Sequence, residues 1–196
     1  DYPGQIINDG IGAICDTINS SDSKVSSIGI GPLPNIAAAL SRDPGITDNA
    51  RFVGMHGSLR RGYLGAPKPM REFNVKQHTL ACRAVFQAPW EQVITPLDSC
   101  GNVALTGQRF QTVDASEQPL TKAVLANHYG WAEAVADWPL LKQLDMTQQS
   151  SILYDCVAIY LAFAETLLEM EVLPISVTPD GKTLIDEGGD AVRCAT

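Results

Sequence analysis

The side chains with the clearest chemical use are those of Glu72 and Asn74, in the segment Arg71-Glu72-Phe73-Asn74 that ends a loop rich in glycine and proline. We predict a short extended segment, which sends Glu72 and Asn74 to one face and Phe73 into the core, because side chains alternate along a strand. A carboxylate and an amide on one face can accept and donate hydrogen bonds around a hydroxyl-rich ligand. The alternative is an edge strand with two solvated polar residues.

Two aspartates stand where they could join this pair. Asp98 follows a predicted strand over 92–97, and Asp155 precedes an apolar stretch over 156–170 that predicts a buried helix. Each aspartate has a second interpretation as a helix cap or a first-turn charge. Carboxylate and amide oxygens suit Ca²⁺, Mg²⁺ or a sugar, and not a transition metal.

The three histidines give a weaker indication of a functional site than these acidic and amide residues. His56, His78 and His128 lie in dissimilar contexts, and the sequence shows no Ser-His-Asp order better than chance. His56 directly follows a predicted strand over 51–55, so its side chain is either structural or points into a site.

Strands and helices alternate along the chain. Apolar spacing and turn residues predict a helix within 1–22, a strand over 24–30, a turn over 31–35 that leads into a helix, a strand over 51–55, a loop over 56–70, a helix over 77–87, a strand over 92–97, a helix over 119–129 interrupted by Gly130, a helix over 156–170, and a β-hairpin of 173–177 with 183–185. This order predicts an α/β fold, with a mostly parallel sheet flanked by helices, in a single domain over 1–196. Ligands of open α/β sheets bind outside the carboxyl ends of the strands.

Composition limits the partners and the compartment. The 196 residues are 45% hydrophobic and 18% charged with a net charge of −8, which indicates a folded protein and disfavours nucleic acid and anionic membranes as partners. No apolar run approaches the ~20 residues of a membrane helix. Cys15, Cys82 and Cys156 lie on apolar stretches without C-x-x-C spacing, so we expect buried thiols and a reducing, cytoplasmic location. The start at Asp1 without methionine or signal peptide predicts a processed or incompletely represented amino terminus.

Six segments stand in an order that carries a resemblance. They are Gly31-Pro32-Leu33-Pro34-Asn35-Ile36-Ala37, Gly57-Ser58 with Arg60-Arg61-Gly62-Tyr63, Glu72-Phe73-Asn74-Val75, Pro96-Leu97-Asp98, Leu153-Tyr154-Asp155 and Val177 to Thr183. The first three resemble the G-P-L-T-N-I-A turn, the loop after the M-G-G strand and the E-F-N segment of the inosine/uridine-preferring nucleoside hydrolase family, and the others fall where that family has counterparts. The aspartate-rich D-x-D-x-x-x-D-D segment that opens the family is not present in these residues, which predicts an incomplete version of its fold.

The resemblance implies hydrolysis of the N-glycosidic bond of purine and pyrimidine ribonucleosides, giving ribose and free base, with Ca²⁺ as the cofactor. It implies that Glu72 and Asn74 bind ribose hydroxyls, and that Asp155 and the backbone carbonyl of Ile30 are metal ligands. Tyr154 stands where many members have His, and a phenol with a pKa near ~10 is the poorer acid at neutral pH. Ca²⁺ takes about 6–8 oxygens, so these residues alone do not complete its site.

Three functions stay open from the sequence. The chain is a nucleoside hydrolase whose aspartate-rich part is absent here or held as a separate fragment, a catalytically disabled hydrolase-fold protein used for binding or storage, or an unrelated sugar-binding module. The expected partner is a ribonucleoside or ribose, together with either further copies in a homo-oligomer or the missing amino-terminal fragment. Neither nucleic acid nor a membrane is expected.

Overall fold

The computed structural model describes residues 3–196 and divides the chain into two compact units. The larger unit comprises the chain up to Gly101 together with Tyr154–Thr196, and the smaller comprises Asn102–Leu153. The site residues predicted from the sequence all belong to the larger unit.

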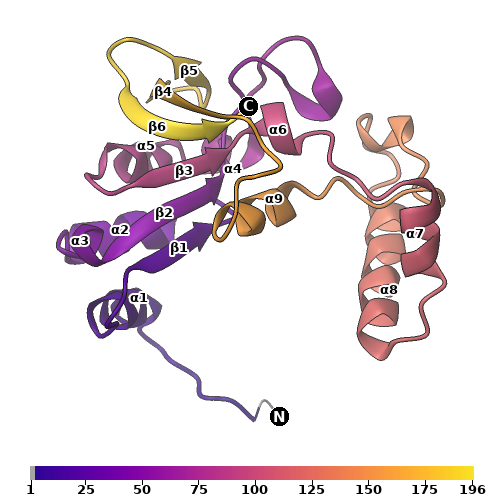
Figure 1. Ribbon diagram of the computed structural model, residues 1–196, viewed down its shortest axis with the longest axis horizontal. Coiled ribbons are helices and arrows are strands. Elements are labelled where there is room, and N and C mark those ends of the chain that lie inside the picture. The colour runs from indigo at the N-terminus through magenta and orange to yellow at the C-terminus, as the bar shows by residue number, and fades with distance from the viewer. Residues whose placement is uncertain (1–2) are drawn as a thin grey trace. The chain divides into compact units, whose positions relative to one another are not determined.

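Within the described residues, the larger unit holds one six-stranded sheet in the order β1-β2-β3-β6-β4-β5 (Figure 1). The pairs β1–β2, β2–β3 and β3–β6 are parallel, whereas β4 runs antiparallel to both β6 and β5. The strands are β1 (Val25–Gly29), β2 (Ala50–Met55), β3 (Gln92–Thr95), β4 (Met170–Val177), β5 (Thr183–Ile185) and β6 (Asp190–Ala195). The predicted α/β fold and late β-hairpin are confirmed, and the sheet is mixed because β4 and β5 join it in the antiparallel sense.

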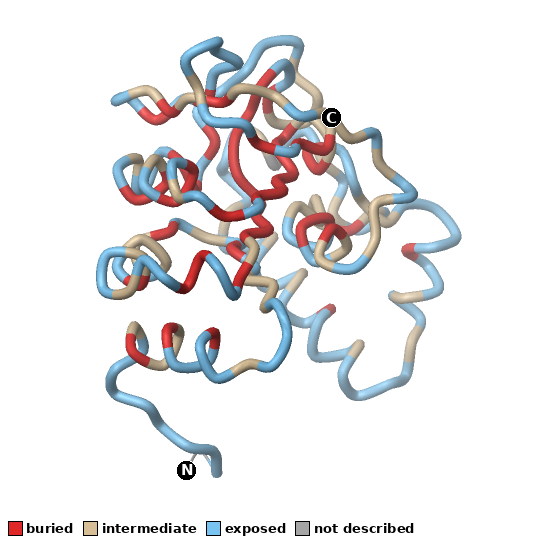
Figure 2. Tube along the Cα trace, turned by 60° about the vertical axis from the view of Figure 1, so that its left-hand side comes forward, coloured by how far each residue is buried: buried red, intermediate tan, exposed pale blue. Residues whose placement is uncertain are grey.

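The central strands are buried on both faces, because successive side chains point to opposite sides. Phe52 and Ile94 pack into the core formed with α1, α2 and α5, while Val53 and Val93 pack on the other side against Leu161 of α9. Figure 2 shows the resulting buried stretches running through the middle of the sheet. These helices are α1 (Gly10–Asn19), α2 (Pro34–Arg42), α5 (Thr79–Gln87) and α9 (Tyr154–Leu161).

Short helical elements occupy the connections of the larger unit. They are α3 (Ile46–Asn49), the 3-10 turn η1 (Tyr63–Gly65), α4 (Phe73–Gln77) and α6 (Leu97–Cys100). Leu64 within η1 has a φ of 53°, which is unusual for a residue with a branched side chain and marks a tightly constrained loop. His78, with a φ of −144° and a ψ of 62°, is not helical and separates α4 from α5.

The smaller unit is built on α7 (Gly107–Asp114) and α8 (Pro119–Ala134), followed by the 3-10 turn η2 (Leu141–Gln143). Phe110 and Leu125 are buried, and the ring of His128 lies 6.0 Å from that of Phe110. The amide of Ser150 donates to the carbonyl of Leu105 at 2.9 Å, which joins the two ends of this unit.

Several sequence predictions are wrong in extent. The helix predicted over 156–170 ends at Leu161, and β4 begins at Met170, so the long apolar run serves two elements. Gly130 does not interrupt α8, which continues to Ala134, and β6 is a strand that the sequence reasoning missed. The thiol of Cys156 is exposed and not buried. Among the residues described, all five cysteines are free, and no helix has the length and apolarity to cross a membrane.

Candidate functional site

The carboxyl ends of β1, β2 and β3 meet at one edge of the sheet, where ligands of open α/β sheets bind. The parallel register pairs Gly29 with Gly54, so Ile30 follows beside Met55. The amide of His56 donates to the carbonyl of Thr95 on β3, and the carbonyl of Ile30 accepts no hydrogen bond from any described residue. Ile30 is exposed.

The end of β2 holds the carboxylate and the amide predicted from the sequence. We call residues 55–57 the β2 junction. The Met55 carbonyl accepts a 3.0 Å hydrogen bond from Nδ2 of Asn74, and the Gly57 amide donates to Oε2 of Glu72 at 3.2 Å. Glu72 is 2% exposed and Asn74 is 7% exposed. The structure therefore brings this pair together at the strand ends, as predicted.

The conformation predicted for this pair is wrong. Residues 73–77 form helix α4, with Glu72 as its N-cap, and Phe73 is 56% exposed instead of buried in the core. Oε1 of Glu72 accepts from the Asn74 amide at 2.7 Å, and Oε2 accepts from the Val75 amide at 3.1 Å as well as from the junction. The helix forms here because the carboxylate satisfies amides that a helix start leaves without partners. Burial nevertheless raises the pKa of Glu72, against the three amide donors, and the charge of Asp155 raises it further.

The middle residue of the β2 junction is a fully buried histidine. The ring of His56 lies between those of Phe52 and Phe86, at centroid distances of 5.8 and 6.3 Å. Its Nε2 is 3.0 Å from the carbonyl oxygen of Gly31, in the turn that follows β1. Burial lowers the pKa of His56 to about 4, so the ring is neutral at physiological pH. Of the two interpretations that the sequence allowed, the structural one describes its contacts.

The start of α9 brings Tyr154 and Asp155 to the same region. Asp155 is exposed, and partial desolvation raises the pKa of its carboxyl. Tyr154 is half-buried, its ring meets that of Tyr63 edge to face at 6.1 Å, and burial raises the pKa of its hydroxyl.

Tyr63 is a site residue that the sequence reasoning quoted but did not select. Its hydroxyl accepts a 2.8 Å hydrogen bond from the amide of Phe73, at the start of α4. Burial raises the pKa of this hydroxyl to about 12, so it stays protonated. A tyrosine in a constrained loop before an acidic helix start was the only signal available in the sequence.

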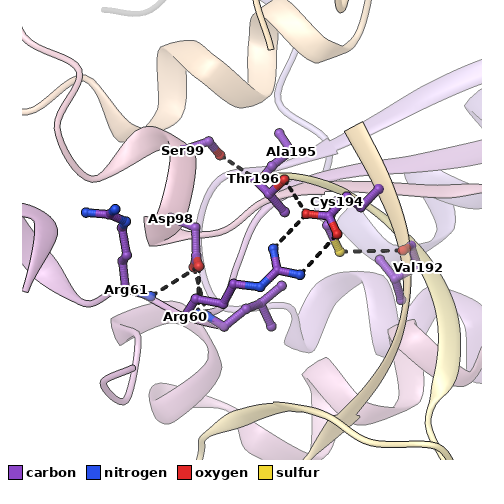
Figure 3. A network of polar contacts seen from close by, with 10 residues as sticks. Arg60, Arg61, Asp98, Ser99, Val192, Cys194, Ala195 and Thr196 are labelled. Carbon is purple, nitrogen blue, oxygen red and sulfur yellow. Dashed lines mark hydrogen bonds and ion pairs between the residues drawn. The ribbon is translucent and has the colours of Figure 1, made fainter. Parts of the chain in front are cut away.

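Asp98 anchors the loop that carries Tyr63. Its Oδ2 accepts from the Leu59 amide at 2.8 Å, and its Oδ1 accepts from the amides of Arg60 and Arg61 at 2.6 and 3.1 Å (Figure 3). The Arg60 guanidinium in turn binds both oxygens of Glu171 on β4, at 2.6 and 3.0 Å. Asp98 does not cap its own helix, as one of the two interpretations from the sequence had it, and its carboxylate holds a distant loop instead.

The donors at this edge do not by themselves fit a bound Ca²⁺. In the described part of the chain, no three His, Cys, Asp or Glu side chains are grouped so that they could hold a metal ion. The Asp155 carboxylate and the Ile30 carbonyl remain, whereas Ca²⁺ takes about 6–8 oxygens. The described residues therefore do not complete a Ca²⁺ site.

Fold and site together define an α/β protein with polar residues gathered at the carboxyl edge of its parallel strands. The model of the inosine-uridine preferring nucleoside hydrolase family matches residues 5–195, and the chain belongs to this family. An uncharacterised protein of Schizosaccharomyces pombe is 30% identical over 130 residues, which are 64% of this chain and 38% of that protein. The pyrimidine-specific ribonucleoside hydrolase RihB of Escherichia coli O1:K1 / APEC is 34% identical over 102 residues, 52% of this chain and 30% of its own.

A solved structure shows the same fold over the whole chain. The purine-preferring ribonucleoside hydrolase from Gardnerella vaginalis superposes with a TM-score of 0.80 at 21% identity, covering 100% of this chain and 63% of that protein. The chain thus spans between about a third and two thirds of the length of these relatives.

Proposed function

We propose that this chain forms the ribose-binding side of a ribonucleoside hydrolase, which cleaves the bond between ribose and a purine or pyrimidine base. Family membership and fold support a ribonucleoside hydrolase activity in general. The observation that carries the proposal for these residues is the β2 junction, which fixes Asn74 and Glu72 at the carboxyl end of β2, beside the strand that Ile30 follows.

In this proposal each polar group has a defined task. Asn74 uses Nδ2 for the Met55 carbonyl and offers Oδ1 to a ribose hydroxyl. Glu72 has used three of its roughly four acceptor positions on backbone amides, so one position on Oε1 is left for a second hydroxyl. Tyr154, with its hydroxyl protonated, is the proposed donor toward the departing base.

These residues offer a cation only a few ligands. Asp155 and the Ile30 carbonyl are the proposed ligands, and a bound Ca²⁺ would orient ribose hydroxyls and a water. Completing such a site requires further oxygen donors, so we expect Ca²⁺ alone to bind weakly to residues 1–196.

Asn74→Ala tests the proposal. Calorimetry with ribose, inosine and uridine should show binding to the wild-type chain and at least about a tenfold weaker binding to the variant, because a hydrogen bond to the sugar is lost. We expect the unfolding free energy to fall by about 1 kcal/mol, since the buried bond to Met55 is lost as well. Wild-type affinity in a folded variant would refute the site.

The second candidate function is a binding or storage protein without catalysis, which the lack of a complete metal centre among the described residues favours. Release of ribose from inosine or uridine in the presence of Ca²⁺ separates the two candidates. Binding of nucleoside without release of ribose would select the binding protein.

A further inference from the structure

The turn between β1 and α2 has few backbone amides that could form hydrogen bonds within the turn. We call residues 30–33 the β1–α2 turn. Pro32 within it and Pro34 directly after it have no amide hydrogen to donate. Its first residue, Ile30, is exposed, while Leu33 is buried in the core against the sheet. Something outside the turn therefore has to fix the orientation of the peptide groups at Ile30 and Gly31.

The side chain of His56 is placed to do this. Its Nε2 is 3.0 Å from the Gly31 carbonyl, and because a carbonyl oxygen only accepts, Nε2 must carry the proton. Its Nδ1 has no hydrogen-bond partner among the residues that the structure describes. An apolar side chain would fill the same space between Phe52 and Phe86 without leaving a nitrogen unpaired, so packing alone does not account for a histidine here.

Neighbouring residues fix the orientation of the ring. A Cβ atom at Gly54 would lie 2.6 Å from Nδ1 of His56 and 2.6 Å from Cζ of Phe52, so the ring needs the glycine beside it. A Cβ atom at Gly29 would likewise lie 2.8 Å from Cδ2 of Leu33. The last residue pair of the β1–β2 ladder thus consists of two glycines that let the ring and the turn approach the sheet.

We infer that His56 is a positioning residue, which holds the β1–α2 turn so that the Ile30 carbonyl faces the same ligand as Asn74. The inference rests on the proposed function for the ligand. Its structural basis is that the carbonyl of Met55 and the side chain of His56, adjacent in the chain, hold Asn74 and Gly31 respectively at the same distance of 3.0 Å. Asn74 and the β1–α2 turn, the two sides of the proposed sugar site, are therefore both held by adjacent residues at the end of β2.

Two substitutions separate the hydrogen bond from the packing. His56→Leu removes the donor and keeps an apolar side chain, whereas His56→Gln keeps an amide that can donate to Gly31. We expect binding of ribose or inosine, measured by calorimetry, to weaken about tenfold in His56→Leu and to return to within about threefold of wild type in His56→Gln. Amide hydrogen exchange at Ile30 and Gly31 should accelerate in His56→Leu and be slowed again in His56→Gln.

Gln92→Leu is the matched control, because Gln92, at the start of β3, is also a buried polar residue with one atom that has no hydrogen-bond partner among the described residues. Its Nε2 donates to the Phe86 carbonyl at 2.7 Å, and its buried Oε1 has no partner among the described residues. We expect Gln92→Leu to change stability while leaving ligand affinity and exchange of the β1–α2 turn unchanged.

The outcomes decide the inference in each case. Equal affinity and equal exchange in wild type and a folded His56→Leu would overturn it, as would a His56→Gln that behaves like His56→Leu. If His56→Leu does not fold, His56→Asn, whose amide is too short to reach Gly31, takes its place against His56→Gln. If the wild-type chain binds neither ribose nor inosine, the proposed function fails, and the exchange comparison alone decides the role of His56.

Discussion

Among the helices of the larger unit that have an acidic residue at their start, α4 and α9 place the carboxylate in opposite surroundings. Glu72 precedes α4, is buried, and accepts hydrogen bonds from the amides of Gly57, Asn74 and Val75. Asp155 lies in the first turn of α9, is exposed, and has no hydrogen bond to any described residue. Glu72 maintains the fold with the acceptor positions that the backbone occupies and, in our proposal, keeps one position for a ligand, whereas the acceptor positions of Asp155 are all available to a ligand. The comparison shows that the residue type at a helix start does not decide its role.

The largest effect that we predict is on stability, from Glu72→Ala. Removing this carboxylate leaves three buried amides without acceptors, so the free energy of unfolding should fall by about 3 kcal/mol or more. Urea denaturation followed by circular dichroism measures this loss. Asp155→Ala is the matched control and should change stability by no more than about 0.5 kcal/mol. Equal losses of stability in the two variants would contradict the different structural roles of Glu72 and Asp155.

The pH dependence of stability gives a second test of the buried surroundings of Glu72. Burial raises the pKa of Glu72 from 4.5 in the folded state, so the folded chain binds this proton more tightly than the unfolded chain. Stability is therefore expected to decrease as pH rises from about 4.5 through the folded pKa. Denaturation of wild type and Glu72→Gln between pH 4 and 7 measures the difference, and the variant should lack this decrease.

A second carboxylate gives an internal reference for that experiment. The Arg60 guanidinium beside Glu171 lowers the pKa of Glu171 to about 2, so its stabilising effect is lost only as pH falls from 4.5 toward 2. The two groups thus act in different pH ranges and in opposite senses. His56, whose pKa burial lowers to about 4, makes stability rise with pH over part of the same range, so the effect of Glu72 is taken from the difference between wild type and Glu72→Gln. A difference that does not change with pH above 4.5 would contradict the raised pKa of Glu72.

The smallest change in stability, with a large change in binding, is predicted for Asp155→Asn. Removing this charge relieves its repulsion with Glu72, so stability should stay constant or rise by a few tenths of a kcal/mol. Ribose or nucleoside binding in the presence of Ca²⁺ should weaken at least about tenfold if Asp155 is a ligand. Calorimetry with and without Ca²⁺ checks this, and binding that is independent of both the cation and the substitution would assign Asp155 to the solvated surface.

The sequence predicted the parts of the fold that depend on local patterns. The β4–β5 hairpin follows from the alternation of Leu173, Ile175 and Val177, and β1 and β2 follow from short apolar runs that end at glycine or methionine. β6 was missed because its apolar residues are separated by Asp190 and Arg193 and its pairing partner β3 lies far away in sequence.

The site was predicted in position and not in conformation. Glutamate is not among the preferred N-cap residues, so no local pattern predicts that α4 begins at this segment. The roles of Asp98 and Tyr63 depend on contacts across 39 and 10 residues, which no spacing rule reveals. His56 could not be assigned for the same reason, since its partner Gly31 lies 25 residues earlier.

The β2 junction also sets how this protein can change in length. Adding or deleting one residue within 55–57 would shift the bonds to Asn74, Gly31 and Glu72 together, because adjacent residues of an extended chain point in opposite directions. The loop over 64–69 is bounded by fixed anchors and reaches the surface, so it can lengthen or shorten without moving them. Comparison of chain lengths among relatives should therefore find insertions in the loop and a constant spacing in the junction.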